Sequence, residues 1–253
     1  MGTRRTAAAR QIEMEAHPLD AALHFDAPTH TYTVHGATYT SVTTFLKPLF
    51  PPFDADRVIA KMVQGKNWEN SPYFGQTPDE IKEKWRLSGE EAAAQGTKLH
   101  ADIEHYYKQL PFSNDSPEFA YFREFALYAE AAHLKPYRAE WTVYDCGFQI
   151  AGTIDMVFEC ADGTLQIFDW KRVKKIERGN PFRVFASHPK LAHLPDTNYS
   201  HYALQLNLYK LIVERNYGKR VSALKLVALH PTLSSYEIHD VGDLSAELAA
   251  LLL

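Results

Sequence analysis

Two aspartates on neighbouring predicted strands are the residues of this sequence best placed to do chemistry. Asp155 lies in the segment Gly152–Asp155, and Asp169 lies in the segment Phe168–Lys171. Asp155 precedes the turn residue Asp162 by seven positions, and Asp169 follows it by seven. Directly opposed residues of an antiparallel pair have side chains within about 5 Å of each other. We therefore expect the two carboxylates to lie side by side.

Two carboxylates at such short range repel each other, and burial among apolar residues increases the repulsion because it removes the screening by water. Both aspartates are flanked by apolar residues. A hard divalent cation relieves the repulsion through oxygen coordination, and Mg²⁺ or Mn²⁺ suits carboxylates. The pair therefore indicates a metal site. The alternative is a hairpin whose aspartates are exposed at its ends and bind nothing.

Lys171 follows Asp169 at the spacing that places both side chains on one face of a strand. An ammonium group beside a metal can neutralise the charge that develops on a phosphate. Asp-x-Lys is a common tripeptide, however. An ion pair on one face, or simply the start of a basic loop, explains it equally well when it is taken alone.

Two helical pairs add polar groups of the kind that a phosphate site needs. His100 and Glu104 are spaced i, i+4 and so share a helix face, as do Gln205 and Tyr209. Imidazole is a borderline ligand that favours Mn²⁺ relative to an all-oxygen site. Gln205 and Tyr209 can hydrogen-bond a phosphate or a base. Taken singly, each pair is also typical of an ordinary helix surface.

In their order along the chain, these residues resemble the signature of the PD-(D/E)XK nuclease superfamily, and most closely its RecB/Cas4-like exonuclease branch. That branch carries G-x-x-x-H, G-x-x-D, D-x-K and Q-x-x-x-Y motifs, which match Gly96–His100, Gly152–Asp155, Asp169–Lys171 and Gln205–Tyr209. The segment Ser41–Thr44 is similar to an S-V-T-T element of viral and mitochondrial exonucleases of this type. Each motif is weak alone, but the ordered set, with Glu140 on a strand between the first two, is specific.

The resemblance implies an α/β fold, a three-layer α/β/α restriction-endonuclease-like core with a mixed central sheet and a helical N-terminal portion. It implies that Mg²⁺ or Mn²⁺ is held by three side chains and one backbone carbonyl: His100, Asp155, Asp169 and the carbonyl of Trp170. Lys171 would be the catalytic lysine, and Gln205 and Tyr209 would support the site and contact DNA. Glu104 and Glu140 are further candidates for contacts with the metal or water.

The cysteines limit the cofactors. Many members of the branch hold an iron–sulfur cluster with four cysteines, and this chain has only Cys146 and Cys160, so we expect no iron–sulfur cluster. Two cysteines also cannot build a disulfide scaffold, which predicts an intracellular, reducing compartment without distinguishing cytoplasm, nucleus, organelle or virus factory.

A basic segment after Asp169 predicts a DNA-binding track. Phe182 and Phe185 are interleaved with its cations and could stack on the bases of a single strand. Many family members have Thr or Ser after the lysine, where this chain has a basic residue. The alternative is a solvated surface loop. The candidate nucleic-acid contacts are Arg172, Lys174, Lys175, Arg178 and Arg183.

Hydrophobic periodicity predicts the elements that must position these residues. Helices are expected at 54–64, 78–109, 118–133 and 198–217 and at the C-terminus, with Gly89 and Gly96 as possible interruptions of the second. A hairpin is expected at 31–42, and strands are expected at 138–144, 149–159, 164–170, 223–229 and 235–238.

Length and composition limit the number of domains and the classes of protein that this sequence can form. The chain has 253 residues, 45% of them hydrophobic, and a formal net charge of -4. We expect one domain, with residues 1–20 flexible, 21–135 mainly helical and 136–240 forming the catalytic sheet, because single cores grow to about 250–300 residues. No apolar run is long enough for a membrane helix. The mild acidity excludes indiscriminate wrapping of nucleic acid, but it does not exclude a local basic track.

Together, the residues and the resemblance predict a metal-dependent nuclease that hydrolyses DNA phosphodiester bonds. The first expectation is an exonuclease that acts on single-stranded ends in repair, replication or recombination. The alternatives are a structure-selective or site-specific endonuclease of the same fold, and a non-catalytic nucleic-acid-binding module. An unrelated hydrolase of small phosphoesters would leave the basic, aromatic segment unexplained.

Overall fold

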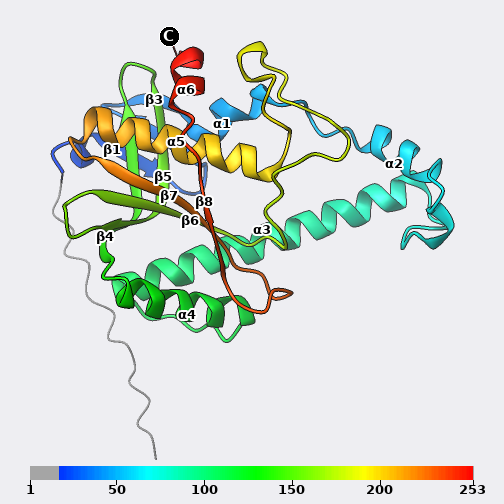
Figure 1. Ribbon diagram of the computed structural model, residues 1–253, viewed down its shortest axis with the longest axis horizontal. Helices are drawn as coiled ribbons and strands as arrows, with labels where there is room; N and C mark the ends of the chain where they lie inside the picture. The colour runs from blue at the N-terminus through cyan, green and yellow to red at the C-terminus, as the bar shows by residue number, and fades with distance from the viewer. Residues whose placement is uncertain (1–16, 253) are drawn as a thin grey trace, which may run out of the picture.

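A mixed sheet forms the middle layer of the computed structural model, which describes residues 17–252 (Figure 1). The strand order is β1-β2-β3-β5-β6-β7-β8, with β4 paired to the other edge of β5. The β3/β5 and β6/β7 pairs are parallel, and the others are antiparallel. The strands are β1 (Leu23–Asp26), β2 (Thr31–Val34), β3 (Ala37–Ser41), β4 (Lys135–Asp145), β5 (Ile150–Glu159), β6 (Leu165–Lys171), β7 (Val221–Ala228) and β8 (Glu237–Asp240).

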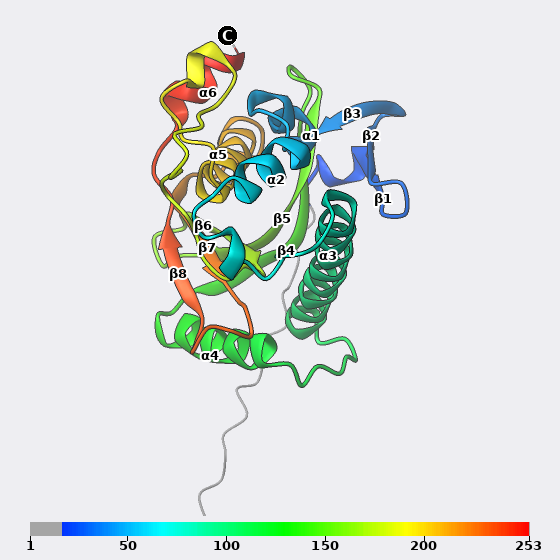
Figure 2. The same cartoon turned by 90° about the vertical axis from the view of Figure 1, so that its right-hand side faces the viewer.

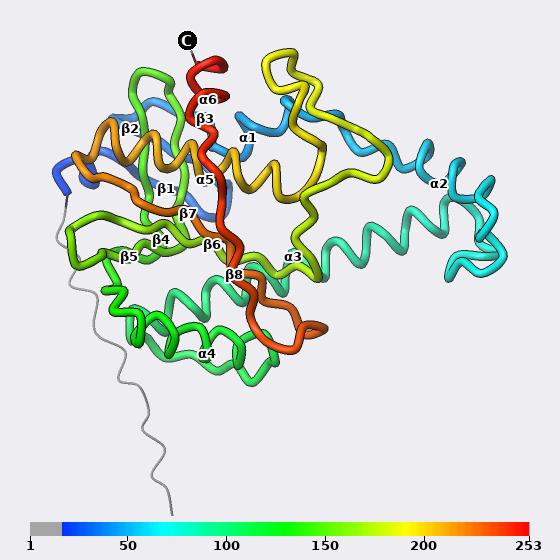
Figure 3. Tube along the Cα trace, in the orientation of Figure 1, coloured from blue at the N-terminus to red at the C-terminus, as the bar shows by residue number. Residues whose placement is uncertain are grey.

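Helices cover both faces of the sheet, which gives the α/β/α layering (Figure 2). The helices α1, α5 and α6 lie on one face, and α3 and α4 lie on the other, while α2 sits at the far end of α3 (Figure 3). The expected mixed α/β fold of three layers is therefore confirmed. The helices are α1 (Val42–Leu46), α2 (Ala55–Val63), α3 (Pro78–Lys108), α4 (Pro117–Ala131), α5 (Asn198–Asn216) and α6 (Ser245–Leu252). Within residues 17–252, no helix combines the length and apolar character needed to cross a membrane.

Each face of the sheet carries its own core. On the α4 side, Phe122 and Phe125 pack edge-on against Trp170 of β6 at centroid distances of 5.6 and 5.1 Å. On the α5 side, Leu206 and Ile212 pack over Ile167 of β6. Because β6 is anchored from both faces, the residues at its carboxyl end are held in fixed positions.

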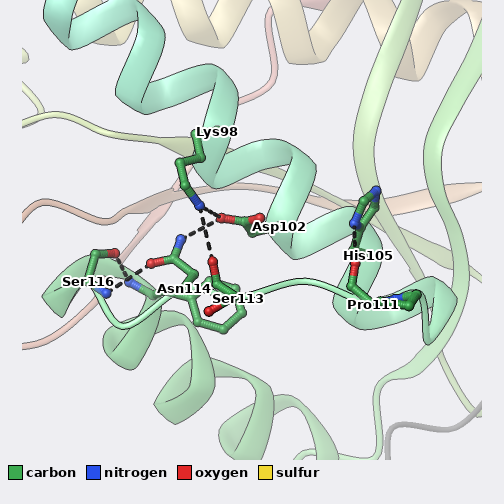
Figure 4. Close-up of polar contacts among 8 residues, drawn as sticks. Lys98, Asp102, His105, Pro111, Ser113, Asn114 and Ser116 are labelled. Carbon is green, nitrogen blue, oxygen red and sulfur yellow. Dashed lines mark hydrogen bonds and ion pairs between the residues drawn. The ribbon is translucent and has the colours of Figure 1, made fainter.

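Polar contacts tie the C-terminal half of α3 to α4 (Figure 4). The carboxylate of Asp102, a buried residue of α3, accepts hydrogen bonds from Lys98 and from Asn114 in the connecting loop. The side chain of Asn114 in turn accepts from the backbone N–H of Ser116, and Ser116 caps α4. A buried carboxylate needs such partners. The network therefore fixes the part of α3 that carries His100.

The predicted elements match the structure closely, but some short elements were not predicted. The helix expected at 78–109 is α3, and it runs without interruption through Gly89 and Gly96. Helix α1 was not predicted, nor was strand β1, whose four residues alternate between apolar and polar but are too few to stand out. Of the segment expected to be flexible, residues 1–16 lie outside the described residues, while Asp20 forms a 3.0 Å ion pair with Arg138 of β4.

Gly152 of β5 is required by close packing against α5. A Cβ atom at this position would lie 2.7 Å from Cε1 of Tyr209 and 3.1 Å from Cγ2 of Val42. The Tyr209 side chain is buried, and its hydroxyl accepts a 3.3 Å hydrogen bond from Gln205 Nε2. The Gly152 and Tyr209 motifs are thus two halves of one contact between the sheet and α5.

We predict that Gly152→Ala lowers the free energy of unfolding by about 1–3 kcal/mol, as overpacking does in other cores. In a Tyr209→Leu background the same change should cost less than half as much, because the ring is gone. Urea unfolding of the four proteins measures this coupling. Gly89→Ala is the control: its Cβ meets nothing within 4 Å, so it should raise stability by about 0.4–1 kcal/mol. Equal costs of Gly152→Ala in both backgrounds would contradict the packing argument.

Candidate active site

The candidate site lies where β5 and β6 separate. The pairing of β5 with β6 ends at Met156 opposite Phe168, and β3 pairs with the start of β5 at Ala151. The edge of β5 between these two partners is open, and Asp155 lies on it. The observed register is the one counted from the Asp162-Gly163 turn. It places Asp155 and Asp169 on opposite sides of the opening.

Glu140 of β4 joins the site through a distortion of both strands. The flanking pairs are Ala139 with Met156 and Trp141 with Ile154, so Glu140 lies opposite Asp155. Residues two apart on a regular strand share a face. Here Trp141 and Ile154 pack in the α5-side core, whereas Ala139 and Met156 pack in the α4-side core. The alternation therefore breaks at the two acids.

The backbone dihedral angle of Glu140 shows this distortion directly. Its φ angle is +48°, in the left-handed region that non-glycine residues avoid. Such outliers cost about 1–3 kcal/mol and gather at functional sites. We interpret the distortion as the feature that brings the Glu140 carboxylate to the opening beside Asp155.

His100 approaches the opening from α3. Its Nδ1 lies 3.5 Å from Oδ2 of Asp155, and its Nε2 lies 2.9 Å from the carbonyl oxygen of Trp170. The same Asp155 oxygen accepts a 2.8 Å hydrogen bond from the backbone N–H of Trp170. The carboxylate thus caps the edge of β6 that β5 leaves unpaired, and the imidazole bridges α3 to this edge.

Lys171 and Asp169 form the other side of the site. Lys171 Nζ lies 2.7 Å from Oδ2 of Asp169 and 4.5 Å from the centroid of the Tyr202 ring on α5. The Asp169 carboxylate is nearly fully buried, and its Oδ2 makes no hydrogen bond of good geometry within the described part of the chain. The charge partner of this buried oxygen is the ammonium group of Lys171.

The crowding of acids shifts their ionisation in opposite directions. Burial, reinforced by the charge of Asp155, raises the pKa of Glu140 to about 8. Burial also raises the pKa of Asp169 to about 6, although Lys171 opposes the shift. For Asp155, burial is outweighed by the charge of His100, and its pKa is lowered.

The two cations of the site respond to the same acids. Burial would lower the pKa of His100, but the charge of Asp155 outweighs it and raises the pKa to about 9. Burial likewise acts against the charge of Lys171, and Asp169 still raises its pKa. Without a metal, these two side chains balance the clustered carboxylates.

A divalent cation fits this donor set. One ligand atom each from His100, Glu140 and Asp155 lies within 4.8 Å of the others. Imidazole with carboxylates is a set that Mn²⁺ and Mg²⁺ accept. Of the ligands predicted from sequence, His100, Asp155 and the further candidate Glu140 belong to this cluster. Asp169 and the carbonyl of Trp170 lie beside it, with Asp169 opposite Asp155 in the strand register.

Other predicted residues lie elsewhere. Glu104 is not in the cluster, since it pairs with Lys108 one turn further along α3. Arg172 is held against α4, because its Nε donates a 2.8 Å hydrogen bond to the buried Glu118. Tyr209 is too buried to contact DNA and acts as packing behind the site. For Arg172 and Tyr209 the sequence does not show which partner lies across the tertiary contact, whereas the pair of Glu104 with Lys108 is a local i, i+4 contact within α3.

The remaining basic residues follow β6 in a surface loop. Lys174, Lys175, Arg178 and Arg183 are all exposed. Arg178 stacks on the ring of Tyr199 with a 3.8 Å separation and donates to the carbonyl oxygen of Asp240. Lys175 has only a loose 3.7 Å ion pair with Glu177. The loop therefore offers cations near the site, with Arg178 held more firmly than the others.

A cleft next to the site was not predicted from the sequence. Its volume is 1440 Å³, and it lies between the α1–α2 region, the loop after β6, and α5. Tyr202 and Gln205 line it, so it begins beside Lys171. Phe53, before α2, also lines it and is 73% exposed. The sequence signals for this surface are Phe182 in the basic segment and Phe53 after Pro51-Pro52.

Comparisons with known proteins do not assign a family. No family model matches this sequence, and no curated protein matches it. A crystal structure of SSO0001 aligns with 53% of this chain at 13% sequence identity and a TM-score of 0.30. The match spans about half, 54%, of that other chain. The function must therefore be argued from the site itself.

We predict that the metal-free protein loses stability as pH rises from about 5 to 9. Between pH 4.5 and 8, unfolded Glu140 releases its proton while folded Glu140 keeps it, which favours unfolding. The stabilisation from charged His100 is present below pH 6.5 and is lost as pH rises through about 9. Thermal unfolding in a chelator, followed across this range, measures the effect.

Glu140→Gln should flatten this pH dependence, because the amide mimics the protonated acid. Glu159→Gln, at the far end of β5, is the matched control and should keep the parent profile. Added Mn²⁺ should stabilise the parent more at pH 8.5 than at pH 6, because binding displaces protons from the ligands. A profile unchanged by Glu140→Gln would contradict the placement of this acid.

Proposed function

We propose that this protein is a metal-dependent nuclease that hydrolyses DNA phosphodiester bonds, with Mg²⁺ or Mn²⁺ as its cofactor. The observation that carries the proposal is the cluster at the open edge of β5. There His100, Glu140 and Asp155 come within ligating distance of one another, next to the ion pair between Asp169 and Lys171. These residues match the PD-(D/E)XK pattern in order and in chemistry.

The proposed reaction divides the work among the residues. A divalent cation bound there would lower the pKa of water and stabilise charge on the phosphate. Asp155, Glu140 and His100 would hold it, and the carboxylate of Asp169, paired with Lys171, would face the same opening. Because the distorted strand fixes Glu140 in advance, little reorganisation is needed when the cation binds.

Lys171 is proposed as an electrostatic group rather than a base. Its raised pKa keeps it an ammonium at neutral pH, so it can donate to a phosphoryl oxygen but cannot accept a proton from water. The ring of Tyr202 lies on one side of it, and Asp169 lies on another. The ammonium is thus aimed by its neighbours at the opening.

The preferred substrate is DNA with single-stranded ends, and the preferred mode is exonucleolytic. The exposed cations of the loop after β6, with Phe182 at its tip 77% exposed, support this part of the proposal. An endonuclease of the same fold is the second candidate. A non-catalytic binding module is disfavoured because pure binding needs neither clustered acids nor a strained Glu140. The reducing compartment inferred from the two cysteines belongs to the same proposal, and both cysteines are free.

We predict that Asp155→Asn abolishes Mn²⁺-dependent cleavage of a single-stranded oligonucleotide while leaving the fold intact. Lys171→Met should keep Mn²⁺ binding and reduce kcat by about 10²–10³-fold, as loss of one stabilising donor does elsewhere. Mn²⁺ binding followed by calorimetry, together with single-turnover cleavage, separates the two roles. Lys175→Met is the control for loss of a positive charge. Full activity in Asp155→Asn would refute the site assignment.

The mode of cleavage has its own test. We expect end-labelled linear single strands to be degraded and circular single strands to survive when Mg²⁺ or Mn²⁺ is supplied in both assays. Linear duplex and flap substrates in parallel show whether an unpaired end is needed. Cleavage of the circle would replace the exonuclease proposal with the endonuclease one.

A further inference from the structure

The cleft beside the site has the size of a binding groove for an oligomer. At 1440 Å³ it exceeds the roughly 300–1,000 Å³ of small-molecule pockets. One side is formed by the segment that leads into α2, with Phe53, and by Arg57 and Lys61 of α2 itself. The other side is formed by the loop after β6, with Phe182 and Val184.

The two sides are fixed to each other at the base of the cleft. The backbone N–H groups of Ser187 and His188 both donate to the carbonyl oxygen of Leu49, at 2.8 and 3.2 Å. The loop is closed on itself where Ala186 donates to the carbonyl oxygen of Leu194. The cleft is therefore preformed, which reduces the entropy lost on binding.

Its chemistry combines exposed aromatic rings with unpaired cations. Phe53 and Phe182 are the two most exposed large apolar side chains among residues 17–252, at 73% and 77%. Arg57 and Lys61 take part in no ion pair with any described residue. The acids on the lining are already engaged: Asp54 caps α2, and Asp196 pairs with His201. Rings beside free cations suit stacked bases joined by phosphates.

The floor of the cleft leads to the candidate site. His201 and Gln205 are one helical turn apart on α5 and line the cleft, as does Tyr202. His201 is held by a 2.8 Å contact with Asp196 and stacks on Phe50 at 3.9 Å. Tyr202 lies against Lys171. One helix thus connects the cleft to the ammonium group of the proposed catalytic site.

We propose that this cleft binds the unpaired strand next to the phosphate that is cleaved, with α2 and its approach as the wall opposite the loop after β6. Phe53 and Phe182 stack on bases, and Arg57 and Lys61 contact phosphates. The proposal rests on the nuclease function above and adds the binding surface that makes the site selective for unpaired strands. The basic loop alone provides only one of the two walls.

Binding without cleavage tests the cleft directly. We expect a fluorescent oligo(dT) in chelator to bind Phe53→Ala and Phe182→Ala each about 5–150-fold more weakly than the parent, the range set by loss of one stacked base. Phe74→Ala is the matched control, since Phe74 is also an exposed phenylalanine, in the segment between α2 and α3, but it does not line the cleft. Parental affinity in both cleft variants would overturn the proposal.

The cations have a separate signature in salt. The double variant Arg57→Gln/Lys61→Gln should reduce the slope of log affinity against log salt by about 1.4, which corresponds to two fewer phosphate contacts on a single strand. Arg57→Lys should retain the parental slope. An unchanged slope in the double variant would remove α2 from the binding surface.

A wrong cleft proposal and a wrong nuclease proposal give different experimental results. Cleavage of bis(p-nitrophenyl) phosphate by the parent with Mn²⁺ tests the chemistry with a probe that has no strand. If the parent cleaves this diester but binds no oligo(dT), the cleft proposal is wrong and another occupant, such as a peptide, must be sought. If oligo(dT) binding depends on Phe53 and Phe182 but no diester is cleaved, the cleft stands and the proposed catalysis fails.

Discussion

The repulsion among three buried carboxylates is the constraint on which the rest of this structure depends. Glu140, Asp155 and Asp169 meet at the open edge of β5, and burial denies them the screening that water would give. In the metal-free state the protein balances them with His100 and Lys171 and by keeping Glu140 protonated at neutral pH. These are partial remedies, because the raised pKa values of the Glu140 and Asp169 carboxyl groups represent stability lost at neutral pH. A divalent cation would relieve all of them together.

The sheet accepts this arrangement only because it is irregular at one place. Strand β5 pairs with β3 near its start and with β6 towards its end. Between these two stretches, this edge of β5 has no strand partner, and side chains occupy the gap. Asp155 takes the hydrogen bond of the Trp170 N–H, so the opening costs no unsatisfied donor at that point. On the other edge, the left-handed Glu140 changes which face of β4 enters which core.

The sequence predicts the architecture well because the architecture follows from periodicity. The three central strands and the long helices lie where alternation and helical spacing place them, and the register of β5 with β6 follows from counting outward from the turn. It also predicts that His100, Asp155 and Lys171 converge, because motif order fixes their elements. It could not rank Glu140 above Glu104, since the left-handed residue in β4 has no local signal. Nor could it show that Arg172 pairs with Glu118 of α4.

Helix α5 makes the site and the cleft mechanically dependent on each other. Tyr209 packs on Gly152 so closely that the strand and the helix cannot move independently. One turn away, Gln205 bonds Tyr209 and lines the cleft, and one turn further His201 is fixed by Asp196. A DNA strand in the cleft and a cation at Asp155 would therefore act on opposite ends of the same rigid face of α5. In the proposed nuclease, alignment of a phosphate with Lys171 would depend on this helix as much as on the loop, and the buried Tyr209 would contribute by packing.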